Sequence, residues 1–512
     1  MKNLPLLQRG GFVLAAFLLI TLLAHLLTAT HYPMFRDEFY YLDCANHLDY
    51  GYVDQPPFSI FVLDGWRMIF GDSLFAVRLL PSLLAVALMW LTWKITEEMG
   101  GGLFARTLAC GAAFFSPQLR ALAGFYSMNA FDLVFWAAAA LILIRIAKTN
   151  DSRLWIPFGI IAGWGLLNKI SLLYFGAGLI VAMALTPLRR QFARRQFWIG
   201  GIMALLLFLP YVLWQFSHEF ATLQFIRNAT AFKNAAFAPH QFLMEFALEN
   251  NPISILLWLG GLGVLLFYKP LRTFRFLGWL ALTVLVILMT NKGKPYYAAG
   301  LFPLLIASGA VWLESKFALP RLKWARLAYA GLLVAGGLLL LPFGLRILNP
   351  ETYIDYQWTL GIEPKASEKG QQDALWPQHY ADSFGWEELA QATVRAYNQL
   401  DPEEKKDCVI FARNYGEAGA INYYCRKQGL PEAVCGHNNY YFWGPPVVGV
   451  HTVFLVVAKP ERDPRDVFDS IFVGGGSDND YAMPTERKLV VFIGRGIHRS
   501  LAEIWAANKS FD

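Results

Sequence analysis

Residues 31–58 read HYPMFRDEFYYLDCANHLDYGYVDQPPF, and this stretch decides how the rest of the chain is interpreted. It lies between two long apolar segments, and tyrosines are interleaved with its charged residues. Those charged residues are Arg36, Asp37, Glu38, Asp43, Asp49 and Asp54. Carboxylates beside a bilayer are costly unless they have a partner or a role, and a simple spacer needs none of them. We therefore predict that this stretch is half of an active site at a membrane surface.

The composition predicts one large membrane domain and one smaller water-exposed domain. The chain has 512 residues, of which 56% are hydrophobic and 16% are charged, whereas soluble proteins average about 25% charged residues. Charges are sparse up to about Leu345 and ordinary afterwards. We expect a transmembrane domain over residues 1–348, with an acidic first outer loop at 30–74, and an extracytoplasmic α/β domain over 349–512. The net charge of +6 is modest, and no basic stripe with interleaved aromatic residues predicts a nucleic-acid surface.

The apolar segments predict a polytopic helical protein with about eleven transmembrane helices, since a span needs about 20 residues. The segments lie near residues 11–29, 75–97, 103–118, 128–147, 154–168, 170–186, 198–216, 253–268, 276–291, 296–313 and 326–347. With an inside N-terminus, the basic loops all fall on the cytoplasmic side, as the positive-inside rule requires. The 31–58 stretch, residues 217–252 and the tail then fall outside. The first apolar segment lacks a small-residue cleavage site, so we expect an uncleaved anchor.

The tail reads as a small α/β domain. Residues 408–412, 451–458 and 488–494 are predicted strands, and residues 417–428 a helix that Gly429 and Pro431 end. The run GGGSDND (474–480) is expected to be a turn, and it lacks the features of a phosphate loop. Among the five cysteines, Cys408, Cys425 and Cys435 lie in the tail, where a disulfide or ordinary buried thiols are both consistent with the sequence.

Two groups of carboxylates in the opening stretch are candidates for chemistry. Asp37 and Glu38 are adjacent, so one side chain can face a reaction centre while the other orients it or pairs with Arg36. A solvated loop with a local Arg36–Asp37 pair explains the same residues without catalysis. Asp54 precedes Gln55-Pro56-Pro57, and the two prolines stiffen the chain, which suits an acid or a metal ligand and equally suits a helix start.

At this point the residues resemble a known superfamily. RDE-FYY, GYVDQPPF, the following FGDSLFAVRLLPSL, MNAFDLVFW (128–136) and KPYYAAGLFPLL (294–305) are similar to the protein O-mannosyltransferases and aminoarabinose (lipid A) transferases. The tail segment 412–446 also resembles tails of bacterial members. These proteins are GT-C fold membrane glycosyltransferases that take a sugar from a polyprenyl-phosphate carrier on the extracytoplasmic side. The resemblance implies that fold and a bacterial inner membrane location, with a periplasmic C-terminal domain.

The resemblance also implies roles for particular residues. Asp37 matches the acidic residue that activates or positions the acceptor, and Glu38 completes that pair. Asp54 takes the place of an acidic residue that helps hold a metal, although Gln55 stands here where aminoarabinose transferases have lysine. Asp132 matches a further acidic position that faces the cavity.

Topology adds candidates for binding the carrier phosphate and a metal. Cations are expected near the phosphate at the outer face, and five basic residues fall at predicted outer helix ends: Arg120, Lys169, Arg227, Lys292 and Lys294. Snorkelling toward lipid headgroups explains each of them equally well. His218, in the 217–252 loop, could join Asp54 in binding a divalent ion. No nucleotide or organic cofactor is expected.

These features predict an inverting glycosyltransferase. A sugar would move from a polyprenyl-phosphate donor to an acceptor that is lipid A, another envelope glycan or a protein, with Asp37 as the base. A transporter or flippase for lipid-linked glycans is an alternative, although the sequence lacks two hydropathy-matched halves. A non-catalytic glycan-assembly subunit is a second alternative, and it would tolerate substitution of Asp37 or Asp54.

Overall fold

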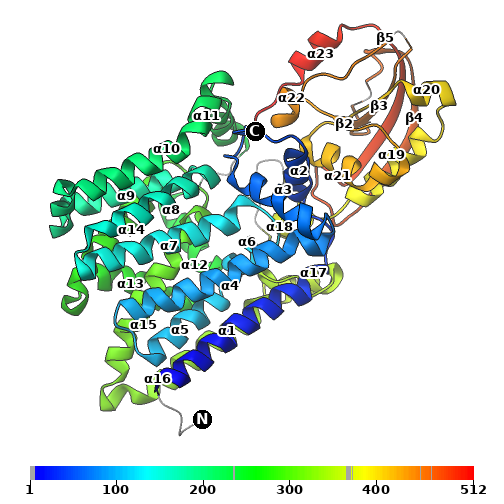
Figure 1. Ribbon diagram of the computed structural model, residues 1–512. Helices are drawn as coiled ribbons and strands as arrows, with labels where there is room; N and C mark the ends of the chain where they lie inside the picture. Colours follow the sequence, from blue (N-terminus) through cyan, green and yellow to red (C-terminus); the bar gives the residue numbers. More distant parts are fainter. Residues whose placement is uncertain (1–5, 234–236, 365–370, 372, 450, 463) are drawn as a thin grey trace.

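The computed structural model describes residues 6–233, 237–364, 371, 373–449, 451–462 and 464–512. A bundle of apolar helices forms one part of the molecule and a domain with a five-stranded sheet forms the other (Figure 1). The first helix, α1 (Leu6–Thr28), begins at the end of the bundle far from the sheet (Figure 1). The chain is therefore a polytopic helical membrane protein with a C-terminal α/β domain, as the sequence predicts.

Each of the eleven predicted apolar segments forms a helix. These helices are α1 (Leu6–Thr28), α4 (Leu74–Glu98), α5 (Leu103–Phe114), α7 (Met128–Thr149), α8 (Trp155–Asn168), α9 (Leu172–Leu185), α10 (Arg195–Ser217), α13 (Ile255–Phe267), α14 (Arg275–Thr290), α15 (Phe302–Phe317) and α16 (Lys323–Leu340). Within the described residues, seven helices are long and apolar enough to cross a membrane, and up to nine if two bent pairs each count as one span. This criterion leaves out α5 and α8, which have only 12 and 14 residues, and the number of eleven crossings stays a prediction.

Shorter helices connect the bundle. They are α2 (Arg36–Asn46), α3 (Phe58–Phe70), α6 (Pro117–Leu122), α11 (Ala221–Asn228) and α12 (Pro239–Glu249), together with the 3₁₀ segment η6 (Pro295–Leu301). The 31–58 stretch is thus not a plain loop, because its centre is helical. The side chain of Ser73 caps α4 by accepting a hydrogen bond from the Ala76 N–H at 3.2 Å.

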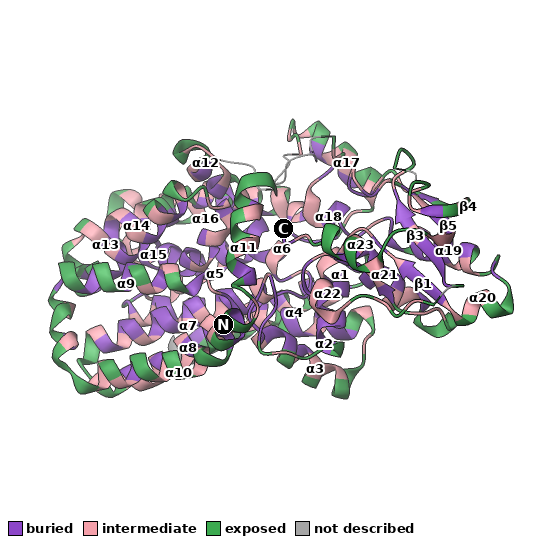
Figure 2. Cartoon of the chain, turned by 90° about the horizontal axis from the view of Figure 1, so that it is seen from above, coloured by how far each residue is buried: buried purple, intermediate pink, exposed green. Residues whose placement is uncertain are grey.

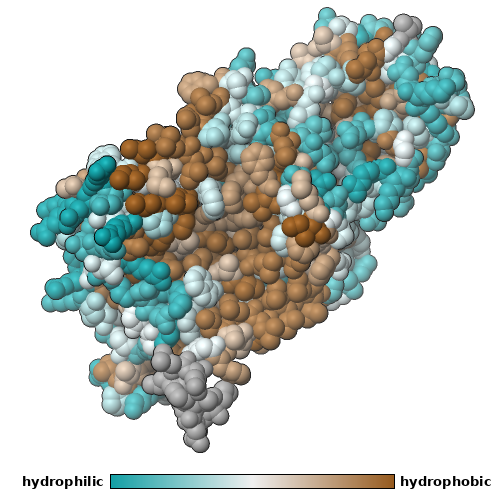
Figure 3. Space-filling model, in the orientation of Figure 1, coloured by the Kyte–Doolittle hydropathy of each residue, from teal (hydrophilic) through white to brown (hydrophobic). Residues whose placement is uncertain are grey.

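The surface of the bundle is apolar where helices face outward. Only 17% of the apolar window of α10 is buried, and its exposed residues include Leu205, Leu206 and Leu213. A broad hydrophobic face covers the helical part, whereas hydrophilic residues dominate the sheet domain (Figure 3). Such a surface is stable in lipid and costly in water.

The sheet domain has strand order β2-β1-β3-β5-β4. Its strands are β1 (Cys408–Phe411), β2 (Ala433–Val434), β3 (Val453–Ala458), β4 (Phe468–Asp478) and β5 (Lys488–Ile497). β1 runs parallel to β2 and β3, while β5 is antiparallel to β3 and β4. The expected turn at 474–480 was wrong, because residues 474–478 belong to β4. Gly475 packs against the backbone of Ala392, where a Cβ would lie 2.5 Å from the carbonyl oxygen, and this close approach explains the glycine.

Helices cover the sheet and join it to the bundle. They are α17 (Pro350–Thr359), α18 (Gln378–Ala381), α19 (Trp386–Tyr397), α20 (Pro402–Lys406), α21 (Tyr415–Cys425), α22 (Asn439–Trp443) and α23 (Leu501–Ala507). One hydrophobic core contains residues of α2 and α3 together with residues of α19, α21 and the strands. Buried residues accordingly continue from the bundle into the sheet domain (Figure 2). The domain boundary at 348/349 stays a prediction.

All five cysteines are described, and each is a buried free thiol. The sequence was consistent with a disulfide or with ordinary buried thiols, and the structure has buried thiols.

Candidate active site

The opening stretch is anchored to the sheet domain through the first turn of α2. The Arg36 N–H donates to the Asp382 carbonyl oxygen at 2.9 Å, and the Arg36 guanidinium lies 3.5 Å from the Asp382 carboxylate. The indole N–H of Trp386 donates to the same carbonyl oxygen of Asp382 at 2.8 Å. The start of α2 is therefore fixed by residues some 350 positions later in the chain.

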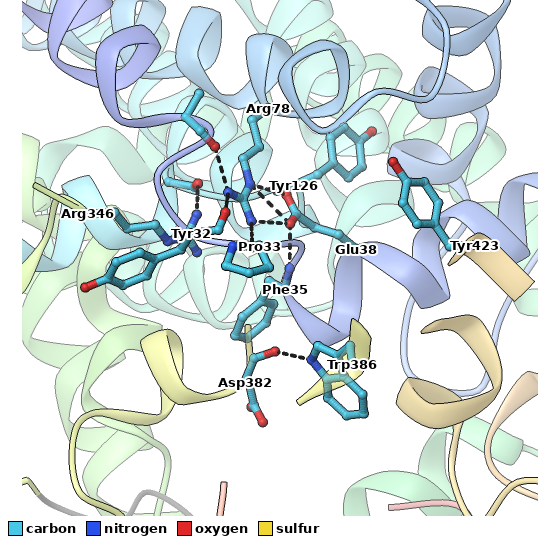
Figure 4. A network of polar contacts seen from close by, with 12 residues as sticks. Tyr32, Pro33, Phe35, Glu38, Arg78, Tyr126, Arg346, Asp382, Trp386 and Tyr423 are labelled. Atoms are coloured by element: carbon cyan, nitrogen blue, oxygen red, sulfur yellow. Dashed lines mark hydrogen bonds and ion pairs between the residues drawn. The ribbon is translucent and has the colours of Figure 1, made fainter. Parts of the chain in front are cut away.

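Glu38 is fully buried and its carboxylate is enclosed by donors (Figure 4). Oε2 accepts from Nη2 of Arg78 at 2.7 Å and from the Phe35 N–H at 2.8 Å. Oε1 accepts from Nε of Arg78 at 3.0 Å and from the Tyr126 N–H at 2.8 Å. Arg78 is 1% exposed, and it also donates to the carbonyl oxygens of Ala29, Tyr32 and Pro33. This network ties α1, α2, α4 and the α6–α7 connection together, so the geometry gives Glu38 a structural role.

Asp37 has other partners than the Glu38 network. Its side chain is 33% exposed, and its Oδ1 accepts a hydrogen bond from the Tyr415 hydroxyl at 2.9 Å. Nε of Arg36 lies 3.6 Å from the same oxygen, and the Arg36 guanidinium lies 5.5 Å from the centre of the Tyr415 ring. A carboxylate that is partly exposed and held by a neighbouring hydroxyl can receive a proton from a bound molecule.

Asp54 and Asp37 are brought to the same side of α2. The Tyr40 hydroxyl donates to Oδ1 of Asp54 at 3.0 Å, and the Tyr40 ring lies 4.8 Å from the Tyr415 ring. Burial raises the pKa of Tyr41 well above its usual value, and the charges of Asp54 and Asp37 raise it further. Tyr41 is therefore within electrostatic reach of both carboxylates, although they are 17 residues apart in the sequence.

Tyr41 also connects the carboxylates to Lys169. Its hydroxyl oxygen accepts from the Met128 N–H at 3.0 Å, at the start of α7. The next residue, Asn129, accepts from Nζ of Lys169 at 2.7 Å. Nζ also lies 5.0 and 5.4 Å from the ring centres of Tyr297 and Tyr296 in η6. The α8–α9 turn, the start of α7 and η6 thus meet beside α2.

Asp132 is the charged partner of Lys169. Its Oδ2 lies 3.8 Å from Nζ of Lys169 and accepts from the Ser171 hydroxyl at 3.0 Å, and its Oδ1 accepts from the Trp136 indole at 3.0 Å. A buried lysine needs such a partner. The geometry therefore gives Asp132 the role of holding Lys169.

The other predicted cations are placed differently from one another. Lys294 precedes η6, next to the tyrosines that face Lys169, and Lys292 is exposed with a left-handed backbone (φ 55°). Arg227 is exposed on α11. Arg120 is buried at 1% exposure, and its Nη1 lies 3.0 Å from Nε2 of His25. Arg120 is thus enclosed in the protein, whereas Lys292 and Lys294 share the loop beside Lys169.

His218 is packed rather than gathered with acidic groups. Its ring stacks on Trp214 at 4.0 Å, and its Nδ1 lies 3.0 Å from the Trp214 carbonyl oxygen. In the part of the chain that the structure describes, no three His, Cys, Asp or Glu side chains are grouped to hold a metal ion. The binding of a divalent ion by Asp54 and His218 stays a prediction.

Asp43 is a buried carboxylate whose role the sequence left open. Burial raises its pKa to about 6, although hydrogen bonds from Tyr440 and from Asn422 (2.8 Å) act in the opposite direction. Tyr440 and Asn439 belong to the aromatic segment 437–446, and Asn439 accepts from the Val53 N–H at 2.7 Å. This segment packs the sheet domain onto the opening stretch.

Sequence reasoning missed two residues of this site. Arg78 lies inside a predicted span, where a charge is rare and usually paired, and that rarity was a usable signal. Tyr415 lies 378 residues after Asp37, and nothing local in the sequence indicates that the two side chains meet.

The sequence and the fold were compared with those of known proteins. Residues 54–214 match the family described as dolichyl-phosphate-mannose-protein mannosyltransferase. The structure is similar to ArnT from Cupriavidus metallidurans in the apo state, with a TM-score of 0.64 and 13% sequence identity, over 94% of this chain and 98% of that chain. The same enzyme bound to undecaprenyl phosphate gives a TM-score of 0.61 at equal identity and coverage. The chain therefore has the GT-C fold.

Two further comparisons agree with the GT-C fold. The Archaeoglobus fulgidus oligosaccharyltransferase, tethered with an acceptor peptide, has a TM-score of 0.51 at 13% identity, over 81% of this chain and 62% of that chain. A curated relative, the lipid A galacturonosyltransferase RgtD of Rhizobium johnstonii, is 24% identical over 271 residues. That alignment covers 51% of this GT-C chain and 56% of the relative, so it spans little more than half of either protein.

Proposed function

We propose that this GT-C protein transfers a sugar from a polyprenyl-phosphate carrier to an acceptor on the extracytoplasmic side of a bacterial inner membrane. The acceptor class would be lipid A, another envelope glycan or a protein. The observation that carries the proposal is Asp37, a partly exposed carboxylate held by Tyr415 beside Asp54 and the Lys169 loop. The fold of a protein crystallised with undecaprenyl phosphate supports it.

The proposed reaction is a displacement at the anomeric carbon. Asp37 takes the proton of the acceptor hydroxyl while that oxygen forms a bond to the anomeric carbon. The bond between this carbon and the phosphate oxygen breaks, and its electron pair leaves with the polyprenyl phosphate. Attack from the side opposite the leaving group inverts the anomeric configuration.

The leaving phosphate needs positive charge nearby. Lys169 is the best placed candidate, since Asn129, Asp132, Tyr296 and Tyr297 hold its ammonium group beside α2. Lys292 and Lys294, in the same loop as the two tyrosines, are the next candidates, followed by the exposed Arg227. Asp54, held by Tyr40, would orient the sugar or acceptor. A divalent cation at Asp54 and His218 stays a prediction, and no step here depends on it.

Transfer in a defined system tests the proposal. The purified full chain in liposomes would receive a polyprenyl-phosphate-linked sugar with a labelled sugar, and a membrane extract would supply acceptors. Label that moves to an acceptor, with release of polyprenyl phosphate, is the expected result. Movement of the intact labelled donor across the bilayer, without transfer, would instead support a flippase. Neither transfer nor movement would leave a glycan-assembly subunit as the explanation.

A further inference from the structure

A small cavity lies where the end of α1, the connection between α6 and α7 and the segment after α16 meet. Its volume is about 10 Å³, which is room for about one water-sized group. Four basic side chains are among its lining residues: His25, Arg78, Arg346 and His379. Arg346 lies beside the Arg78–Glu38 network (Figure 4). The cavity is separate from the Asp37 and Lys169 groups, none of whose residues line it.

The protein around this cavity is short of negative charge. Arg78 has Glu38 as its partner at 2.7 Å. Arg346 is 5% exposed, and it donates to the Gly124 carbonyl oxygen at 2.7 Å and lies 5.8 Å from the centre of the Phe125 ring. These contacts are with neutral groups. Among the described residues, Arg346 makes no ion pair with a carboxylate, and Glu38, whose charge acts on it, is already the partner of Arg78.

Arg120 adds a second unbalanced charge behind the cavity wall. Its Nη1 contacts His25, which lines the cavity, and its guanidinium lies 5.7 Å from the Phe114 ring centre. Its buried Nε has no hydrogen-bond partner within the part of the chain described. Among the described residues, Arg346 and Arg120 thus add two guanidinium groups without an ion pair to a region in which Glu38 is already the partner of Arg78.

Burial is the main cause of the lowered pKa values of two groups beside the cavity, and neighbouring positive charge adds to it. Burial and then the charge of Arg346 lower the pKa of His379 to about 4. Burial and then the charge of Arg78 lower the pKa of Arg346 to about 9. His379 is neutral at pH 7, and its Nε2–H donates to the Phe343 carbonyl oxygen at 3.2 Å, so it adds no charge to compensate the arginines. Burying charges without compensation is strongly unfavourable, so a counter-ion is favoured here.

We propose that this cavity binds one monatomic anion, with chloride as the physiological candidate, between the Arg346 guanidinium and the His25–Arg120 pair. The cavity has room for about one water-sized group, and a single-atom anion is the smallest anion that could occupy it. The bound anion would join the bundle, through α1, to the segment that leads into the sheet domain, through Arg346 and His379. It would thereby stabilise docking of the sheet domain onto the opening stretch.

Thermal unfolding tests this site independently of transfer activity. The purified full chain would be heated in chloride, bromide or gluconate salts of equal ionic strength. Ligand binding to the folded state raises Tm, and we expect Tm to be roughly 3 °C higher in chloride and bromide than in gluconate. Arg346→Met should abolish that difference, and Arg321→Gln, a change at an exposed arginine, should keep it.

A structural readout covers the case in which Arg346→Met does not fold. Crystals of the wild-type chain grown in bromide should show one anomalous peak within contact distance of Arg346. Equal Tm values in all three salts, or a chloride effect that Arg346→Met retains, would overturn the proposal. So would a site without an anomalous peak, which would mean that water fills the cavity, or stabilisation by inorganic phosphate alone.

Discussion

Glu38→Gln separates a structural role of the Glu38–Arg78 pair from a catalytic one. The substitution keeps the size of the side chain but removes its charge. Its amide nitrogen would also face donors, because both carboxylate oxygens now accept from Arg78 and from backbone N–H groups. Arg78, at 1% exposure, would be left without a charged partner. Removing one side of a buried ion pair costs about 3–5 kcal/mol.

That loss is large enough to measure in detergent. For a chain of this size we expect Tm to fall by roughly 5–10 °C at a fixed scan rate. Glu403→Gln is a matched control, since Glu403 pairs with Lys406 at 2.8 Å on the surface and should leave Tm unchanged. The double variant Glu38→Gln, Arg78→Met should recover part of the loss because the Arg78 charge is then no longer buried without its partner. An unchanged Tm together with abolished transfer would refute this reasoning, and Glu38 would then be catalytic.

Three further predictions concern the candidate site. Tyr415→Phe should lower kcat about tenfold with little change in KM in a steady-state transfer assay, because Asp37 loses a positioning hydrogen bond. The control Tyr423→Phe removes a hydroxyl that donates to the Asp72 carbonyl oxygen, and it should leave both constants unchanged. In the folded protein the pKa of Asp43 is raised to about 6. Its contribution to the free energy of unfolding is therefore present below pH 4, and about 3 kcal/mol of it is lost as pH rises through 6. Asp43→Asn should remove that loss when thermal unfolding is measured across this pH range. Lys169→Met should raise KM for the lipid donor and lower Tm, since it leaves Asp132 buried without its charged partner; normal donor saturation would exclude Lys169 from phosphate binding.

The membrane half of the fold could be predicted because lipid imposes strong rules on sequence. Long apolar runs must be helical to satisfy their backbone groups, and every predicted run is a helix here. Their number as complete spans could not be predicted, because α9 and α13 are bent against neighbouring short helices. In the tail, β4 was missed because glycines usually weaken strands, and only the close packing of α19 explains them.

The candidate site could be predicted only in part. The unusual acidity of residues 31–58 pointed to Asp37, Glu38 and Asp54, which lie on or near α2. The different roles of Asp37 and Glu38 could not be predicted, because they depend on distant residues. Arg78 lies 40 residues after Glu38, and Tyr415 lies 378 residues after Asp37. Adjacent residues on a helix point in directions about 100° apart, and tertiary contacts decide which one faces the protein interior.

The rate of sugar transfer by the Asp37→Asn variant tests most directly the central claim that Asp37 is the catalytic base. Wild type, Asp37→Asn and a control, Asp64→Asn on α3, would be compared in liposomes supplied with the labelled lipid-phosphate sugar. The account predicts that Asp37→Asn loses about 10²–10⁴-fold in transfer rate, while its Tm and that of Asp64→Asn match wild type. Transfer at the wild-type rate by folded Asp37→Asn would contradict the account.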